Sequence, residues 1–350
     1  MFDLPDTPAS AGSPSGGPGA SGGRPKRSRA AAAERRGEIA LCAVAVGVLA
    51  VIGGMAVTVL VKGWPSFAHN GLAWFGSGGD VTSQLGAMIN GPKDPGHYVY
   101  YFRAWPLIWG TILTTGVAVV LGLIVSIFAA VFIVEFAPRR VRAVIDPVIR
   151  LLAGGPSVVY GLIGILAIAP WVEHNLISTQ RKRSVEYVVQ LTGANVSVAT
   201  LILTLMIVPI MVAIMVSALE SVPRAWIEGS AALGVNRWRT IWRVSLRTIR
   251  PAIVAGAVLA TARAVGEAIM LAMVSGSNPF APNPLDGSTF FFEPVRTLAS
   301  TIIAYIDSVE VVPVGQTLYA IGAVLLFSCA LLSLASWAAK QPMKRYGIRA

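Results

Sequence analysis

Six long apolar runs constrain the fold of this chain more than any other feature. Each run is long enough for a helix of about 20 residues to cross a lipid bilayer. Lipid offers no hydrogen-bond partners to an exposed backbone, so runs of this kind are expected to be helical. The sequence therefore predicts an all-α integral membrane protein with six transmembrane helices. The expected spans are Ile39–Val61, Leu107–Phe136, Ile149–Trp171, Val196–Leu219, Pro251–Ser275 and Val314–Ala338.

The composition agrees with a membrane protein and argues against metal or disulfide chemistry. Of the 350 residues, 55% are hydrophobic and only 13% are charged, whereas soluble domains are about 25% charged. The cysteines, Cys42 and Cys329, both lie in apolar runs, and the three histidines fall in separate polar segments. We therefore expect neither a disulfide framework nor a metal site.

The polar segments define the expected domain limits. Residues 1–37 are rich in Gly, Ser, Pro and Ala and end in a basic cluster, so a disordered basic arm is expected there. The following run is too long for the apolar part of a signal peptide, which favours a retained span. A six-helix domain at 38–340 and a tail at 341–350 follow. Within the domain, Gly154, Gly155 and Pro156 interrupt the third run and should kink it or make it begin late.

Lys and Arg residues predict the orientation in the membrane. Of the 28, 20 lie in the arm, around the segment between the second and third runs, in residues 221–250 and at the C-terminus. Both termini are therefore expected to be cytoplasmic. The net charge of +11 is concentrated beside the spans, so it is interpreted as a topology signal, and no nucleic-acid partner is expected. The outer loops are expected at 62–106, 172–195 and 276–313.

The cytoplasmic segment 221–250 has the pattern of a helix, a glycine stop and a second helix. Gly234 suits a left-handed helix end, and the second helix is expected from about Val235. Two interpretations are open: an amphipathic helix that lies on lipid headgroups, or a docking element for a soluble partner whose shape Glu228 and Gly234 fix. On the second helix one predicted face holds Arg239, Arg243, Arg247 and Arg250, and another holds Trp238, Ile241, Trp242 and Ser245.

Two charged residues, Arg263 and Glu267, lie inside the expected fifth span. On a continuous helix they would share one face, and each would cost about 2.5–3.5 kcal/mol on insertion scales, so they should face the protein interior. One interpretation is a salt bridge that only fixes helix packing. The other is a substrate path, because the planar guanidinium of Arg263 can hold two oxygens of a tetrahedral oxyanion. Glu267 would then neutralise Arg263 when no anion is bound.

Weaker candidates for the same path follow the interruption of the third run. Ser157 and Tyr160 could line it where backbone groups are freed, and a packing role is equally open. A sharper hypothesis concerns selectivity. Hydrogen phosphate has a P–OH donor and sulfate has none, so an ionised Glu267 would accept from phosphate and repel sulfate.

The segment 221–250 carries a resemblance to a known family. The stretch "EGSAALG", with Ile241, Val244 and Leu246 after it, resembles the EAA motif of ABC importer permeases. That resemblance implies that the loop couples to ATPase subunits, with Glu228 and Gly234 at the acidic and glycine positions of the motif. The residues expected to take part in this coupling are Glu228, Gly234, Trp238, Ile241 and Trp242. Arg247 departs from the family, which commonly has proline there.

Four further stretches narrow the resemblance to the phosphate permeases of PstC type, over about residues 40–340. They imply a type I ABC importer permease fold in the bacterial inner membrane and tie Arg263 and Glu267 to phosphate passage. The implied partners are a homologous permease subunit of PstA type, two ATPase subunits that hydrolyse ATP with Mg, an external phosphate-binding protein and membrane lipid. Gly155 and Ala268 depart from the family. The stretches are "PLIWGTILTT", "GGPSVVYGLIG", "ARAVGEAIM" and "VRTLASTIIA".

The chain is not expected to be an enzyme. It has no G-x-x-x-x-G-K-[ST] loop and no Gly-Lys dipeptide, so ATP should be hydrolysed by other subunits and no cofactor is expected on this chain. A permease for another oxyanion, such as sulfate or molybdate, remains an alternative. A self-sufficient secondary anion transporter is more remote, because it predicts more acidic residues in the spans or inverted repeats.

Overall fold

The computed structural model describes residues 26–185, 190–278 and 280–344, and these are helical apart from connecting segments and one isolated bridge between Gly276 and Val295. The chain divides into two compact units, residues 1–55 and 56–350. The first unit contains most of α1 (Lys26–Asn70). The expected disordered arm at 1–37 is wrong for residues 26–37, which are helical, because alanine and arginine there are strong helix formers. Residues 1–25 lie outside the described part.

Within the described ranges, five helical segments are long and apolar enough to cross a membrane, and a sixth is added if a bent pair counts as one span. The bent pair joins Arg237–Thr248 to Arg250–Val265 at an angle of 65°. These segments confirm the all-α membrane fold. The five are Arg35–Phe75, Trp105–Phe136, Ser157–Asn175, Val196–Glu220 and Val312–Ala335.

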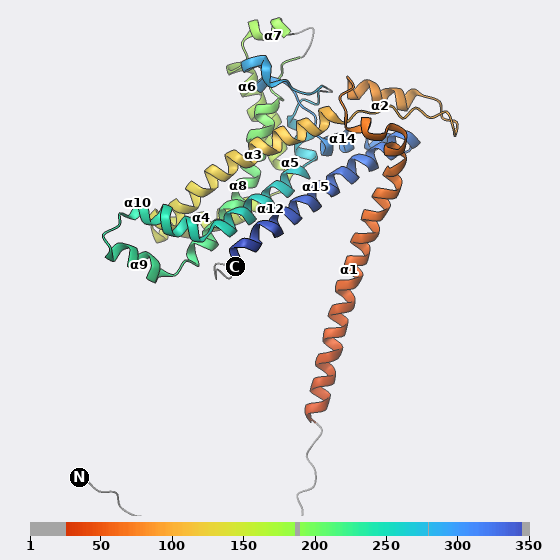
Figure 1. Cartoon of the computed structure of the whole chain (residues 1–350). Coiled ribbons are helices and arrows are strands. Elements are labelled where there is room, and N and C mark those ends of the chain that lie inside the picture. Colours follow the sequence, from red (N-terminus) through yellow and green to blue (C-terminus); the bar gives the residue numbers. More distant parts are fainter. Residues whose placement is uncertain (1–25, 186–189, 279, 345–350) are drawn as a thin grey trace, which may run out of the picture. The chain divides into compact units, whose positions relative to one another are not determined.

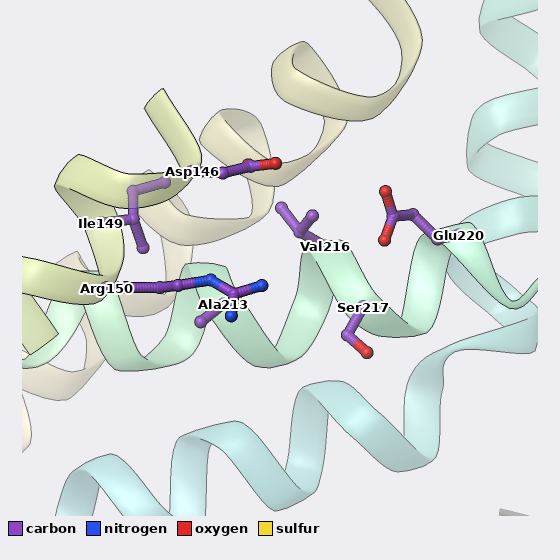
Figure 2. A pocket seen from close by; sticks show the side chains of 7 residues that line it. All are labelled: Asp146, Ile149, Arg150, Ala213, Val216, Ser217 and Glu220. Atoms are coloured by element: carbon purple, nitrogen blue, oxygen red, sulfur yellow. The ribbon is translucent and has the colours of Figure 1, made fainter. Parts of the chain in front are cut away.

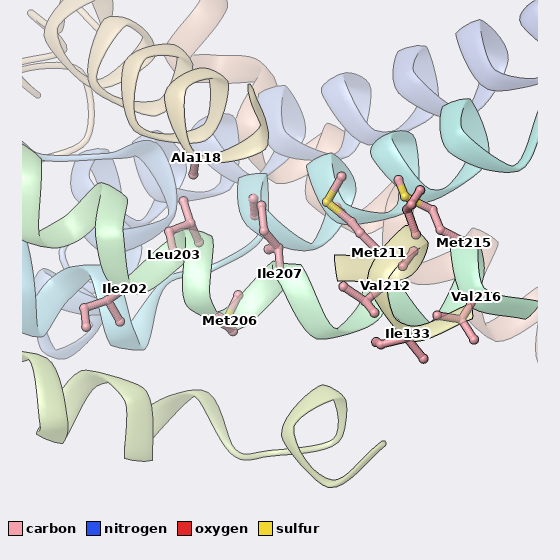
Figure 3. Close-up of a cluster of buried hydrophobic side chains, with 14 of the residues drawn as sticks. Ala118, Ile133, Ile202, Leu203, Met206, Ile207, Met211, Val212, Met215 and Val216 are labelled. Atoms are coloured by element: carbon pink, nitrogen blue, oxygen red, sulfur yellow. The ribbon is translucent and has the colours of Figure 1, made fainter. Parts of the chain in front are cut away.

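The core of the second unit forms around α8 (Val196–Glu220). This helix packs against α3 (Trp105–Val131), α12 (Arg250–Val265) and α4 (Arg139–Ala153). Since lipid is as apolar as these side chains, close packing holds such helices together more than burial does. Gly122 of α3 provides such a contact with Ile207. Figure 3 shows the buried side chains of the cluster, among them Leu203, Met206, Met211, Val212 and Met215.

The third span begins only after the interruption at residues 154–156. α4 ends at Ala153, and a new helix starts at Ser157 as α5 (Ser157–Ile163), continuing through a π turn (η3, Gly164–Ile168) and α6 (Ala169–Asn175). The late beginning predicted from Gly154, Gly155 and Pro156 is therefore confirmed, and the expected bounds Ile149–Trp171 are corrected at their start to Ser157, because Pro156 cannot continue the preceding helix. α4 is amphipathic and lies outside the span.

The remaining helices lie at the two ends of the bundle (Figure 1). At one end α2 (Val81–Asn90) and α14 (Leu298–Ala304) pack near α15 (Val312–Lys344). The last turns of α1 belong to this end, where Ser66 and Thr317 are hydrogen-bonded at 3.1 Å. At the opposite end lie α9 (Arg224–Ala232) and α10 (Arg237–Thr240). The shorter elements are η1 (Gly71–Phe75), η2 (Phe132–Phe136), α7 (Thr179–Val185), η4 (Ile241–Ser245), α11 (Leu246–Thr248), α13 (Ile269–Val274), η5 (Pro284–Phe292) and η6 (Ile306–Ser308).

Candidate functional site

The expected fifth span, Pro251–Ser275, is broken at the charged residues. α12 ends at Val265, Gly266 follows as its C-cap, and α13 begins at Ile269. The Glu267 carboxylate accepts a hydrogen bond from the Met270 backbone N–H at 3.3 Å. A carboxylate beside the free N–H groups of a helix start is favourable, so Glu267 stabilises the beginning of α13. The prediction of one continuous helix with both charges on one face is therefore wrong.

Arg263 is left without the partner that the sequence suggested. Arg263 and Glu267 form no ion pair within 4.0 Å, and the buried Nε of Arg263 has no hydrogen-bond partner among the residues that the structure describes. Arg263 is half-buried, whereas Glu267 is only 9% exposed. A buried N–H without a partner is unfavourable, so the guanidinium retains capacity for an anionic ligand.

Tyr160 lies near Arg263, close enough for the guanidinium charge to act on its hydroxyl. The hydroxyl donates to the Leu152 carbonyl at 3.0 Å and so bridges the break before α5. α5 packs on α13, and a Cβ at Gly161 would lie 3.3 Å from the Met270 Cα. The predicted path residues Tyr160, Arg263 and Glu267 therefore lie around one helix break. Ser157 is half-buried in the first turn of α5 and makes no hydrogen bond to Arg263 or Glu267.

Small residues of α12 let neighbouring helices approach closely. Gly256, Ala260 and Ala264 are all buried, and α12 packs closely on α8 and α15. A Cβ at Gly256 would lie 3.7 Å from Ile214, which is an ordinary contact distance. This packing holds the end of α12, and hence Arg263, against the core.

The segment 221–250 forms the predicted helix–glycine–helix element. Gly234 has φ +72°, the left-handed conformation that ends α9, and its N–H bonds to the Ala231 carbonyl at 2.9 Å. The second helix begins at Arg237 rather than near Val235, because the Asn236 side chain caps it through the Trp238 N–H at 3.0 Å. A 2.8 Å hydrogen bond between Ser230 and Thr240 joins the two helices.

The predicted shared face of Trp238, Ile241, Trp242 and Ser245 is not formed. Ile241 and Ser245 are each 2% exposed, whereas Trp238 and Trp242 are 52% and 48% exposed. The π turn of η4 explains the separation, since its wider spacing rotates side chains away from their α-helical positions. Ile241 therefore anchors the element to the core of the chain, and the two tryptophans face outward.

The comparison with known families is decisive for the larger part of the chain. Residues 122–340 match the family of binding-protein-dependent transport system inner membrane components. The chain belongs to this family. The matched range includes the element 221–250, α12 and both Arg263 and Glu267.

Curated relatives agree with the family. The chain is similar to the probable ABC transporter permease protein YqgH of Bacillus subtilis, with 31% identity over 84% of this chain and 86% of that protein. It is also similar to the phosphate transport system permease protein PstC 1 of Mycobacterium tuberculosis, with 32% identity over 67% of this chain and 71% of that protein. The fold resembles a chain in the crystal structure of a bacterial alginate ABC transporter with its periplasmic protein, with a TM-score of 0.55 at 12% identity, covering 89% and 96% of the two chains.

In this transport-system component, α9 carries exposed residues that sequence reasoning missed. None of its residues is buried, and Glu228 is exposed. Trp226 is 51% exposed and Leu233, just after the helix, is 84% exposed. Trp226 precedes the stretch "EGSAALG" and Leu233 lies within it, and their large apolar side chains in a polar segment were the available signal. The exposed surface of α9 suits a protein partner.

A second feature, a cavity of about 320 Å³, lies between α4 and α8 (Figure 2). Asp146 and Arg150 approach it from α4, and Ser217 and Glu220 approach it from α8. Arg142 pairs with Glu220 and lies 3.7 Å from Asp146, so it joins the two helices electrostatically. We interpret this cluster as structural, because its opposite charges are balanced within the chain.

Proposed function

We propose that this chain is the transmembrane permease subunit of an ATP-driven importer of inorganic phosphate. The observation that carries the proposal is Arg263, a half-buried guanidinium at a helix break whose buried Nε has no partner. A tetrahedral oxyanion supplies the paired acceptors that such a group needs. The similarity to proteins named as PstC phosphate permeases supports phosphate as that oxyanion.

The residues around the break have distinct proposed roles. Arg263 holds the anion, and Tyr160, whose hydroxyl donates to the Leu152 carbonyl, is kept as a candidate on the same path. Glu267 accepts from the P–OH of hydrogen phosphate through the carboxylate oxygen that the Met270 N–H leaves free. Ser157 is kept as a weaker candidate for lining the same path. Phosphate would pass by alternating access, with the break exposed to each side of the membrane in turn.

The element 221–250 is proposed to dock on an ATPase subunit. Its helix–glycine–helix shape and the exposed surface of α9 support this role, with Glu228 and Gly234 in the motif positions. ATP and Mg would be used by two such ATPase subunits, and this chain would bring no ATPase site of its own. A homologous permease of PstA type would complete the path, and an external phosphate-binding protein would deliver the substrate. Both termini would lie on the cytoplasmic side of the bacterial inner membrane.

The test is ATP-driven uptake of labelled phosphate into proteoliposomes that contain the assembled transporter. Arg263→Gln should abolish uptake and leave assembly and ATP hydrolysis intact, because the anion loses its charged ligand. Arg140→Gln is the matched control, since Arg140 is exposed on α4. Uptake that survives in Arg263→Gln would make the arginine a packing residue. If the wild-type transporter took up sulfate or molybdate in place of phosphate, the assignment of phosphate as the substrate would be wrong.

A further inference from the structure

Four aromatic side chains form a continuous group on the surface of the chain where α3 ends. Phe128 contacts Trp242 with 6.4 Å between ring centroids, Trp242 contacts Trp238 at 6.5 Å, and Trp238 contacts Phe136 at 6.0 Å. All three contacts are edge-to-face, a favourable arrangement for aromatic rings. Each of the four rings is about half exposed. We call Phe128, Phe136, Trp238 and Trp242 the aromatic cluster.

The aromatic cluster is continuous with the exposed side of a membrane span. Phe128 lies on α3 and Phe136 is the last residue of the span Trp105–Phe136. Ile124, Val125 and Phe132 are exposed along the same stretch, which is the surface that a span turns towards lipid. Tryptophan is enriched where such a surface meets the headgroups, because its ring is apolar and its N–H is polar. The tryptophans of α10 and η4 therefore extend the lipid-facing surface of α3.

Arg237 fixes this arrangement. Its guanidinium lies over the Phe136 ring, 4.8 Å from the centroid, and pairs with the Glu135 carboxylate at 3.4 Å. A stacked and paired arginine of this kind holds two elements in register. The second helix of the element 221–250 is thereby attached to the end of α3, and the charge of Arg237 is balanced by Glu135.

The charges of two neighbouring arginines, Arg239 and Arg243, are not balanced by an acidic partner among the described residues. Arg239 and Arg243 are exposed, and neither makes a hydrogen bond or ion pair with any residue that the structure describes. They alternate along the chain with Trp238 and Trp242. Basic residues beside aromatic rings that continue a lipid-facing surface suit an anionic headgroup above acyl chains.

We propose that the aromatic cluster with Arg239 and Arg243 binds an anionic phospholipid of the cytoplasmic leaflet. The tryptophan rings contact the upper acyl chains, and the two guanidinium groups contact the headgroup phosphate. α9 and the second helix thus have different partners: α9 docks on protein and the tryptophans of the second helix dock on lipid. This inference does not depend on which anion is transported.

The test uses the purified transporter in nanodiscs of phosphatidylcholine with one quarter phosphatidylglycerol. Brominated acyl chains quench the emission of nearby tryptophans. Two preparations are compared, in which either phosphatidylcholine or phosphatidylglycerol carries these chains, with the same mole fraction of brominated lipid in both. Because the chain has nine tryptophans, the contribution of Trp238 and Trp242 is taken as the difference between wild type and the double variant Trp238→Phe/Trp242→Phe. Trp226→Phe on α9 is the matched control: the contribution of Trp226, taken in the same way as the difference between wild type and this variant, should be insensitive to either brominated lipid.

The expected result is stronger quenching of the Trp238 and Trp242 emission by brominated phosphatidylglycerol. Each arginine near a charged surface contributes about fivefold to anionic lipid affinity, so Arg239→Gln/Arg243→Gln should weaken the preference about 25-fold. Arg239→Lys/Arg243→Lys should retain it. Equal quenching by the two lipids would mean an unselective aromatic belt and would overturn the proposal. Emission unchanged by both lipids would mean that another protein covers the cluster, which would also overturn it.

Discussion

Gly234 offers a clean test of how the shape of the element 221–250 governs energy coupling. Its φ of +72° lies in the left-handed region, and a Cβ built there meets no atom within 4 Å. Gly234→Ala therefore adds conformational strain without a steric clash, and the cost is about 1–2 kcal/mol. Because 1.4 kcal/mol is a factor of ten, the docking-competent shape should become roughly 5- to 30-fold less populated relative to alternatives. Transport should fall because α9 no longer presents one fixed surface.

Gly229 supplies the matched control for this prediction. It lies inside α9, and a Cβ built there also meets nothing within 4 Å. Gly229→Ala should be neutral or stabilise the helix by up to about 1 kcal/mol, since alanine is the better helix former. The assay is phosphate uptake per ATP hydrolysed in proteoliposomes, together with the affinity of the membrane subunits for the ATPase subunits. Equal behaviour of the two variants would refute the reasoning from backbone conformation.

Three further predictions address selectivity, docking and packing. Glu267→Gln keeps an oxygen that can cap α13 but loses the negative charge. Competition assays should therefore show the preference for phosphate over sulfate reduced about tenfold or more. An unchanged preference would exclude Glu267 as the P–OH acceptor. Trp226→Ala should weaken the binding free energy of the ATPase subunits by about 2 kcal/mol, as the loss of an aromatic anchor buried in an interface does. Unaltered recovery of the ATPase subunits in a pull-down would contradict protein docking by α9. Gly110→Ala would place a Cβ 2.3 Å from the Arg296 carbonyl oxygen, so thermal unfolding of the purified complex should reveal a loss of about 1–3 kcal/mol; Gly116→Ala, with no atom within 4 Å, should leave the melting temperature unchanged.

The sequence predicts the apolar spans well, because the thickness of the bilayer sets their length directly. Four of the six expected spans overlap the observed helices over nearly their full lengths, and the left-handed turn at Gly234 follows from the permissive backbone of glycine. The family match and the relatives confirm the fold class that the motifs suggested. The orientation of the termini rests on the distribution of Lys and Arg and stays a prediction.

What the sequence does not predict comes from local departures from α-helical geometry. The run around residue 266 stays apolar on both sides of the break, so periodicity alone cannot find the end of α12, and the expected pairing of Arg263 with Glu267 fails with it. The π turn at 241–245 changes which side chains share a face, and hydrophobic spacing assumes 3.6 residues per turn. In both places a specific hydrogen bond or turn determines the local backbone, and helix propensity and hydrophobic periodicity do not encode it.

The bend between α11 and α12 has a mechanical consequence. α12 starts at the element 221–250 and ends two residues after Arg263, with a 65° corner at one end and a helix break at the other. Its 16 residues make a rod about 24 Å long. A tilt of about 10° at the corner would carry the far end by about 4 Å, a displacement comparable to the size of the anion itself. One end of this rod therefore lies at the proposed phosphate ligand, and the other is joined to the proposed ATPase contact on α9 through α10, η4 and α11, so a movement of the element 221–250 reaches Arg263 along one stretch of chain.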